Sequence, residues 1–163
     1  MSVNKYRPHV MVLPEDDANR ELANGFLLHE SVALRAIQVL VEAGGWSKVR
    51  SLFEEEHIAE MKKNTLRHMV LLVDFDGDSS RLDEMRKAIP ASLVERVFVI
   101  GVWLEPEELK RKKLGSFESI GRQLASECHE NTRVIWNHEL LRHNEQELGR
   151  MTAALRPILF PSS

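Results

Sequence analysis

The chain has 163 residues, of which 43% are hydrophobic and 29% are charged, and this composition fits one domain with a proper hydrophobic core. A net charge of −3 gives no overall attraction to nucleic acid, so any such binding must come from a local basic patch or from bound metal ions. A single cysteine excludes an intrachain disulfide. With no signal-like apolar stretch at the N-terminus and no apolar run of roughly 18–20 residues, we expect a cytoplasmic protein that does not enter a membrane.

Short apolar runs alternate with helical patterns along the first two thirds of the chain. The expected strands are residues 9–13, 36–46, 69–73 and 96–103. The expected helices begin at Asp16 or Asp17, at Ser47 as the cap of residues 47–63, and at the capping-box pair Ser80 and Asp83, with Pro90 as the stop. Nearly continuous apolar strands between helices predict a three-layer α/β fold around a mostly parallel sheet of about four strands.

The last third of the chain is helical in pattern. Residues 116–128 and 137–159 both predict helices, the second with Leu141, Leu148, Met151 and Leu155 on one stripe. No repeat or linker signals a boundary, so we expect one domain over residues 1–163. Its core would span about residues 8–110 and its helical C-terminal cover about residues 116–160.

Acidic residues stand where two expected strands end. Glu15 follows the first strand, and Asp74, Asp76 and Asp78 follow the third. Ligands of open parallel sheets bind at the carboxyl ends of the strands, and several carboxylates held together there need a cation such as Mg²⁺ or Mn²⁺. The alternative is a solvated turn that caps the next helix, because Asp, Gly and Ser all favour turns.

The segment VDFDGDSS, residues 73–80, resembles the first motif of haloacid-dehalogenase-type phosphatases. That resemblance implies that Asp74 is a nucleophile and Asp76 a general acid. The chain departs from that family in two ways: two β-α units precede the motif, and no paired-aspartate motif follows residue 83.

The order of a glutamate after the first strand and Asp-x-Asp after the third resembles the Toprim domain of topoisomerases, primases and OLD-type nucleases. VLPEDDANREL supplies Glu15, and LLVDFDGD supplies Asp74 and Asp76. Glu15-Asp16 stands where that family often has Glu-Gly. The segments GVWLEPEELK and WNHELLRHN resemble parts of small standalone Toprim-like proteins of bacterial defence and mobile-element systems.

The Toprim resemblance implies a Mg²⁺-dependent nuclease that cleaves nucleic-acid phosphodiesters. Asp74 and Asp76, with Asp78 as a further candidate, would hold one or two metal ions, and Glu15 would be a ligand or general base. The expected partners are nucleic acid, DNA ahead of RNA, a separate ATPase, since the chain has no GxxxxGK[ST] loop, and further copies of the chain as a homo-oligomer. A non-catalytic regulatory module with the same fold stays open as an alternative.

A basic run, Lys110, Arg111, Lys112 and Lys113, could contact a phosphate backbone or form a solvated helix face. Glu105 and Glu107 either complete the metal shell or flank Pro106 at a helix start. HELLRH does not predict a zinc site, because its histidines are five residues apart and not four. His138 and His143 are therefore surface histidines, contacts to the end of the sheet, or residues that reach the phosphate site.

Overall fold

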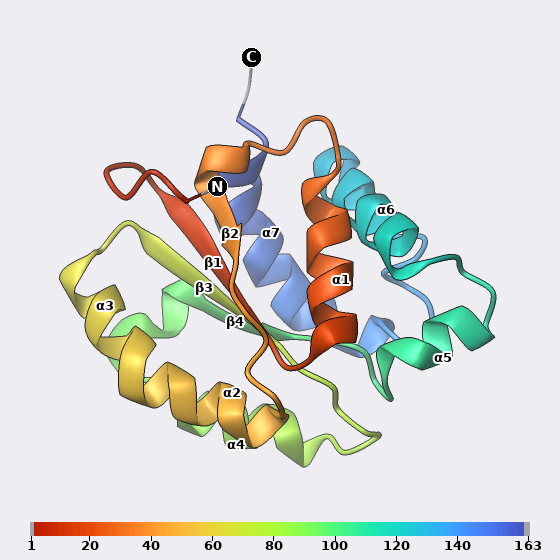
Figure 1. The fold of residues 1–163 in the computed structure, drawn as a ribbon, viewed down its shortest axis with the longest axis horizontal. Helices are drawn as coiled ribbons and strands as arrows, with labels where there is room; N and C mark the ends of the chain where they lie inside the picture. Colours follow the sequence, from red (N-terminus) through yellow and green to blue (C-terminus); the bar gives the residue numbers. More distant parts are fainter. Residues whose placement is uncertain (1, 162–163) are drawn as a thin grey trace.

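The computed structural model describes residues 2–161 as a parallel sheet between two helical layers (Figure 1). The four strands are β1 (His9–Pro14), β2 (Ile37–Val39), β3 (Arg67–Leu72) and β4 (Val97–Ile100). Their order across the sheet is β2-β1-β3-β4, and each neighbouring pair is parallel. The expected three-layer α/β fold with a four-stranded parallel sheet is confirmed.

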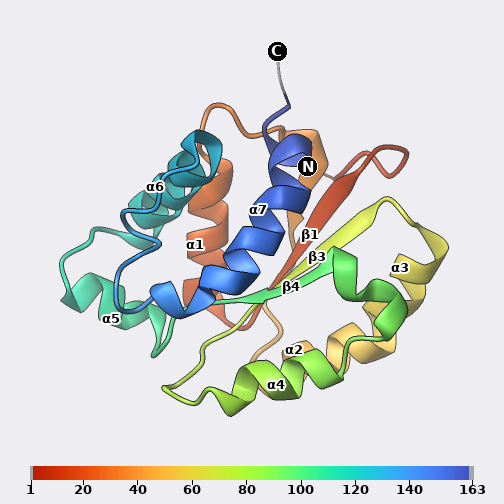
Figure 2. The ribbon, with the colours of Figure 1, turned by 180° about the vertical axis from the view of Figure 1, so that it is seen from behind.

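Helices cover both faces of this sheet (Figure 1 and Figure 2). The α-helices are α1 (Asp17–Leu27), α2 (Trp46–Leu52), α3 (Ile58–Lys63), α4 (Ser80–Lys87), α5 (Pro106–Arg111), α6 (Phe117–Glu130) and α7 (Glu145–Leu159). Shorter turns are the 3-10 segments η1 (Leu34–Ala36), η3 (Ala91–Arg96) and η4 (Arg142–Asn144), and the π-helical turn η2 (Phe53–His57). Between residues 2 and 161, no helix is long and apolar enough to cross a membrane.

Each strand divides its apolar side chains between two cores. Val10 and Val12 of β1 face the core under α1, α6 and α7, whereas Met11 and Leu13 face the core under α2, α3 and α4. This follows from the two-residue period of a strand, because successive side chains point to opposite faces. A strand between two covered faces is therefore apolar at nearly every position, as the sequence is at 10–13 and 69–73.

The second strand is shorter than residues 36–46, and that part of the prediction is wrong. β2 keeps three residues, and after it only single bonds to β1 follow, from the N–H of Leu40 to the carbonyl of Val12 (2.8 Å) and from the N–H of Ala43 to that of Pro14 (2.9 Å). Beyond it the chain turns to place the N–H groups of Gly44 and Gly45 on the carbonyl of Glu15 (2.8 and 3.1 Å). The loop after β2 is thus tied to the end of β1.

The predicted helix starts are correct at α1, where Asp16 is the cap, and at α4, which begins at Ser80, but the predicted cap of α2 and the capping box of α4 are wrong. The helix predicted from Ser47 begins at Trp46, because Gly45 takes the capping position at φ +142°, which a side chain rarely allows. The predicted capping box at Ser80 is replaced by Asp78, whose Oδ1 accepts from the N–H (2.9 Å) and hydroxyl (2.6 Å) of Ser80.

The C-terminal helix begins at Glu145, eight residues later than predicted. Residues 137–144 form turns because the Asn144 side chain binds Gly101 at the edge of the sheet. Leu141, Leu148, Met151 and Leu155 are all buried in one core as expected, although Leu141 precedes the helix.

Side chains from η4 and α7 cover the outer edge of β4 and its continuation. Glu147 accepts the N–H of Val99 (2.9 Å), and the Asn144 amide pairs with both the N–H (3.1 Å) and the carbonyl (2.9 Å) of Gly101. An edge strand otherwise leaves a row of unpaired backbone groups that another chain could pair with. Here a helix satisfies that edge without contributing a strand.

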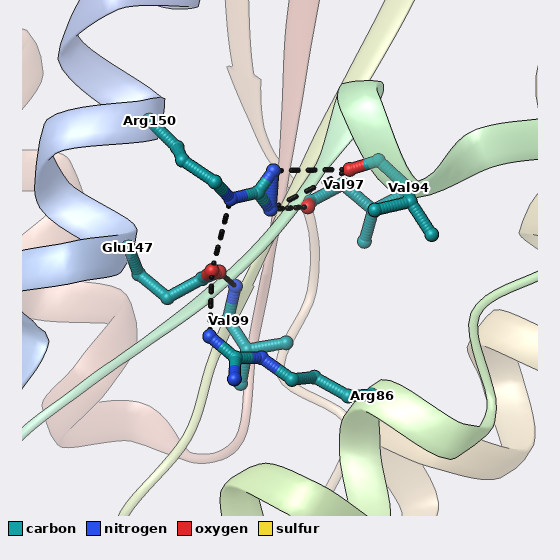
Figure 3. Close-up of polar contacts among 6 residues, drawn as sticks. All are labelled: Arg86, Val94, Val97, Val99, Glu147 and Arg150. Carbon is teal, nitrogen blue, oxygen red and sulfur yellow. Dashed lines mark hydrogen bonds and ion pairs between the residues drawn. The ribbon is translucent and has the colours of Figure 1, made fainter. Parts of the chain in front are cut away.

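Glu147 is the centre of this edge contact (Figure 3). Its side chain is 4% exposed, and it also accepts from Arg86 Nη2 (3.0 Å) and Arg150 Nε (3.2 Å). Arg150 in turn donates to the carbonyls of Val94 (3.1 Å) and Val97 (3.1 Å). The group joins α4, η3, β4 and α7.

A second buried carboxylate orders the loop that follows α6. Glu127 is 1% exposed and accepts the N–H groups of Val134 (2.7 Å), Ile135 (3.0 Å) and Trp136 (3.3 Å). These three donors belong to no helix or strand, so the carboxylate replaces the water they would lose on burial. The loop can therefore pack Trp136 into the core.

Helices α1 and α6 approach each other through glycine. A Cβ atom at Gly121 would lie 2.1 Å from the carbonyl oxygen of Leu22, and one at Gly25 would lie 2.3 Å from that of Glu118. Both contacts are with backbone, which cannot move aside as a side chain can. The closeness of these two helices depends on the absence of a methyl group at both positions.

Glu147→Ala should lower the free energy of unfolding by about 2–3 kcal/mol, because it leaves the N–H of Val99 buried without a partner and two arginines without their carboxylate. Glu147→Gln, which keeps an acceptor oxygen, should lose about half as much. Urea unfolding checks both. The exposed Glu145 on the same helix is the control, and an equal loss in Glu145→Ala would contradict the edge role.

Gly121→Ala should lower the free energy of unfolding by about 2 kcal/mol or more, because the new methyl group would overlap the Leu22 carbonyl. Gly149→Ala in α7 is the matched control, since a Cβ there meets nothing within 4 Å. That control should gain roughly 0.5–1 kcal/mol from helix propensity. Chemical unfolding of both variants separates the two effects, and equal stabilities would contradict the close approach.

Candidate functional site

Two of the four predicted acidic residues meet at the carboxyl ends of β1 and β3. Glu15 and Asp74 are 9% and 7% exposed, and Glu15 Oε2 accepts the backbone N–H of Asp74 at 2.6 Å. Glu15 also continues the ladder through its own N–H, which donates to the carbonyl of Leu72 (2.9 Å). The sheet itself therefore holds these two residues together.

Asn19 joins this pair from the first turn of α1, and sequence reasoning missed it. Its side chain is fully buried, and Nδ2 donates both to Asp74 Oδ1 (2.8 Å) and to Asp16 Oδ1 (2.9 Å). The oxygen of the same amide group, Oδ1, is buried without a hydrogen-bond partner within the described residues. The N-cap signal at Asp16 could have found Asn19, because a cap aspartate faces the residue three positions later.

Burial raises the pKa of Asp74 to about 8. Asn19 opposes this shift by donating to the carboxylate, whereas the charges of Glu15, Asp16 and Glu107 add to it. Burial also raises the pKa of Glu15, against the effect of the Asp74 N–H. The two carboxyl groups therefore lie in a place where a proton or another cation is favoured.

Asp76 lies in the same loop but is exposed, and its charge adds to the effects that raise the pKa of Glu15. Its backbone has φ +50°, its side chain is 58% exposed, and Oδ2 pairs with Arg81 Nη2 at 3.0 Å. Arg81 also donates to the carbonyl of Asp74 (2.8 Å) and lies over the ring of Trp46 (5.1 Å). Sequence reasoning missed Arg81 too, since nothing local distinguishes it from a surface arginine of α4.

Asp78 forms the turn before α4, one residue ahead of the N-cap residue Ser79. Its bonds to Ser80 lower the pKa of its carboxyl group, and the side chain is exposed. This is the turn alternative that the sequence left open for this residue. Across residues 2–161, no three or more His, Cys, Asp or Glu side chains converge in a way that could hold a metal ion.

The two histidines of HELLRH have different surroundings. His143 is packed between the rings of Phe75 (5.0 Å between centroids) and Trp103 (5.3 Å), and burial lowers its pKa to about 4. It therefore contacts the end of the sheet through Phe75, which stands between Asp74 and Asp76. His138 accepts the N–H of Leu140 (3.1 Å) within its own turn.

The basic run forms the end of α5 and the turn after it. Lys110 lies over the ring of Phe117 (4.0 Å), Arg111 pairs with Glu108, and Lys112 pairs with Glu139 (3.3 Å). These three cations already have partners on the protein surface. Lys113 follows them at φ +59°.

Glu105 and Glu107 flank Pro106 at the start of α5, as the helix-start alternative predicts. Pro106 is the first helical residue, Glu105 is the cap residue, and Glu107 lies in the first turn. Glu107 also adds its charge to the field that acts on Asp74.

No protein-family model, curated protein or solved structure matches this chain. Its function must therefore be inferred from the site.

Asp74→Asn should stabilise the metal-free protein at high pH and leave it unchanged at low pH. Below about pH 4, Asp74 is protonated in both the folded and the unfolded protein. Between about pH 4 and about pH 8, the unfolded chain releases this proton, whereas the folded protein keeps it. Stability of the wild type should therefore fall through this range relative to the variant, by on the order of 3 kcal/mol.

Urea unfolding in EDTA from about pH 4 to about pH 9 measures this difference. Asp83→Asn, at an exposed position of α4, is the control and should show a small difference that does not change with pH. A pH-independent difference for Asp74→Asn as well would show that burial does not shift this carboxyl group.

Proposed function

We propose that the protein is a Mg²⁺-dependent phosphoryl-transfer enzyme, a Toprim-like nuclease acting on nucleic-acid phosphodiesters. The observation that carries the proposal is the buried contact of Glu15 with Asp74 at the carboxyl ends of two adjacent parallel strands. Two carboxyl groups buried side by side disfavour ionisation, and burial raises the pKa of both Glu15 and Asp74.

The donor atoms at this place suit a hard cation. Glu15 and Asp74 offer carboxylate oxygens, and Asn19 offers a buried amide oxygen that has no partner. Mg²⁺ prefers such oxygen ligands and completes its shell with water and phosphate oxygens. When bound, the ion would supply Lewis-acid polarisation of the phosphodiester.

The chain's own residues divide the remaining work. Asn19 orients Asp74 by donating to one of its oxygens, and Asp16 fixes the Asn19 amide in turn. Asp76 would become a further ligand only after it leaves Arg81, and the guanidinium would then be free to meet a phosphate oxygen. Glu15, held by the Asp74 N–H, is the candidate general base.

The pairing of Asp76 with Arg81 also favours the second candidate, a non-catalytic module that binds the ion for a partner such as a separate ATPase. In this arrangement one predicted ligand is already neutralised by the protein. The phosphatase alternative gains less support, because two β-α units precede Asp74 and no paired-aspartate motif follows residue 83.

Hydrolysis of plasmid DNA, single-stranded DNA and RNA with Mg²⁺ or Mn²⁺ tests the proposal. Glu15→Gln and Asp74→Asn should each reduce cleavage by at least about 100-fold, because they remove a ligand or the general base. Asp76→Asn should also reduce it. Asp83→Asn is the control with an equal charge change at an exposed site.

The same variants distinguish the alternatives. Folding is checked by circular dichroism, and ion binding by Mn²⁺ titration calorimetry. Ion binding without cleavage by the wild type would favour the non-catalytic module. Hydrolysis of a small phosphomonoester that survives in Glu15→Gln would favour the phosphatase. A wild type that neither cleaves nor binds the ion would overturn the proposal.

A further inference from the structure

A cavity of about 100 Å³ lies between the sheet and helices α1, α6 and α7. Its floor is formed by strand residues that include Val12 and Val70, and its walls by helix residues that include Ala23, Cys128 and Leu155. None of the acidic residues of the candidate site lines it. The cavity is several times larger than the roughly 10–15 Å³ that one water needs, whereas protein cores hold few voids larger than a water.

The lining surface of the cavity is almost entirely apolar, although the polar residues Thr152 and Arg156 also border it. The Asn144 amide is already bonded to Gly101 and Leu141, and burial raises the pKa of the Cys128 thiol to about 12, so the thiol is neutral. The buried polar atoms that have no partner belong to Asn19, Arg20 and His143, and these residues are not part of the lining. A cavity with so little polar surface favours apolar guests over water.

The helices around the cavity cannot simply close it. Gly25 and Gly121 fix α1 against α6 by backbone contact, and Asn144 and Glu147 fix η4 and α7 to the edge of β4. Helices α1 and α6 are thus held to each other, whereas α7 is held to the edge of the sheet. The space between them is filled only as far as the side chains reach.

We propose that this cavity is a binding site for one small, neutral, apolar molecule, of the size of an aromatic ring or a hydrocarbon of about six carbon atoms. Phe26 and Phe160 both line the cavity, and their rings contact each other at 6.2 Å between centroids in a tilted arrangement. They give an aromatic guest ring edges to pack against. The site is separate from the acidic residues and does not depend on the function proposed for them.

Benzene titration of protein labelled with ¹³C at the methionine methyl groups tests the site without any mutation. Met151 lines the cavity, whereas Met61 and Met85 lie in the core on the other side of the sheet. Benzene should shift the Met151 signal saturably and leave the other two unchanged. Phenol should bind at least about tenfold more weakly, because almost the whole lining surface is apolar and its hydroxyl would be desolvated there.

A filled cavity is the second arm of the test. Ala23→Leu places extra methyl groups in the cavity and should abolish the Met151 shift. Ala18→Leu makes the same change in the same helix outside the lining and should retain it. Benzene at about ten times its Kd should also raise the Tm of the wild type by about 2–4 °C. No shift of Met151, or an equal shift of Met61 and Met85, would overturn the proposal whether or not Ala23→Leu folds.

Discussion

Buried carboxylates that accept backbone N–H groups hold this structure together. Glu147 closes the edge of β4, Glu127 orders the loop after α6, and Glu15 links the ends of β1 and β3. Each carboxylate serves donors that no helix or strand bond satisfies, and a buried N–H without a partner would cost about 1–3 kcal/mol. A sheet of four short strands leaves many such groups at its edge and ends. The protein meets this constraint with side chains from distant helices and strand ends, and the positions of α6 and α7 follow from it.

Asp74 differs from these three residues in what surrounds it. Its carboxylate accepts from a side-chain amide, that of Asn19, and not from the backbone, while Glu15, Asp16 and Glu107 all add negative charge nearby. The arrangement stabilises the fold less than a neutral group would, which is the reason to regard it as a functional place. Arg81 supplies the neighbouring positive charge, but it is directed to Asp76 and to the backbone. In the acidic loop, Asp74 is therefore bonded to a neutral amide, whereas Asp76 is already paired with Arg81.

The two faces of the sheet are packed by different means. Under α2, α3 and α4 the core is built from large side chains such as Phe53, Met61 and Phe75, which are fully or almost fully buried. On the other face, glycine contacts bring α1 and α6 together while polar side chains fix α7, and a cavity remains between them. Backbone contacts and edge bonds fix the helix positions, and the side chains between them then fill the space incompletely. The packing of this core therefore depends on contacts that lie outside it.

The sequence alone determined the fold class and the residues at the carboxyl ends of the strands. Mostly apolar strands between helical patterns indicate a parallel sheet whose two faces are both covered by helices. The strands predicted at residues 9–13 and 69–73 therefore place Glu15 and Asp74 near one another, at the carboxyl ends of paired strands. The sequence could not determine that Asn19 binds Asp74, that Glu147 accepts the N–H of Val99, or that Asn144 delays the last helix until Glu145. Those outcomes were decided by tertiary structure, because local capping and helix propensities differ by about 1 kcal/mol. A buried hydrogen bond between residues far apart in the chain is worth as much and exists only once the chain has folded.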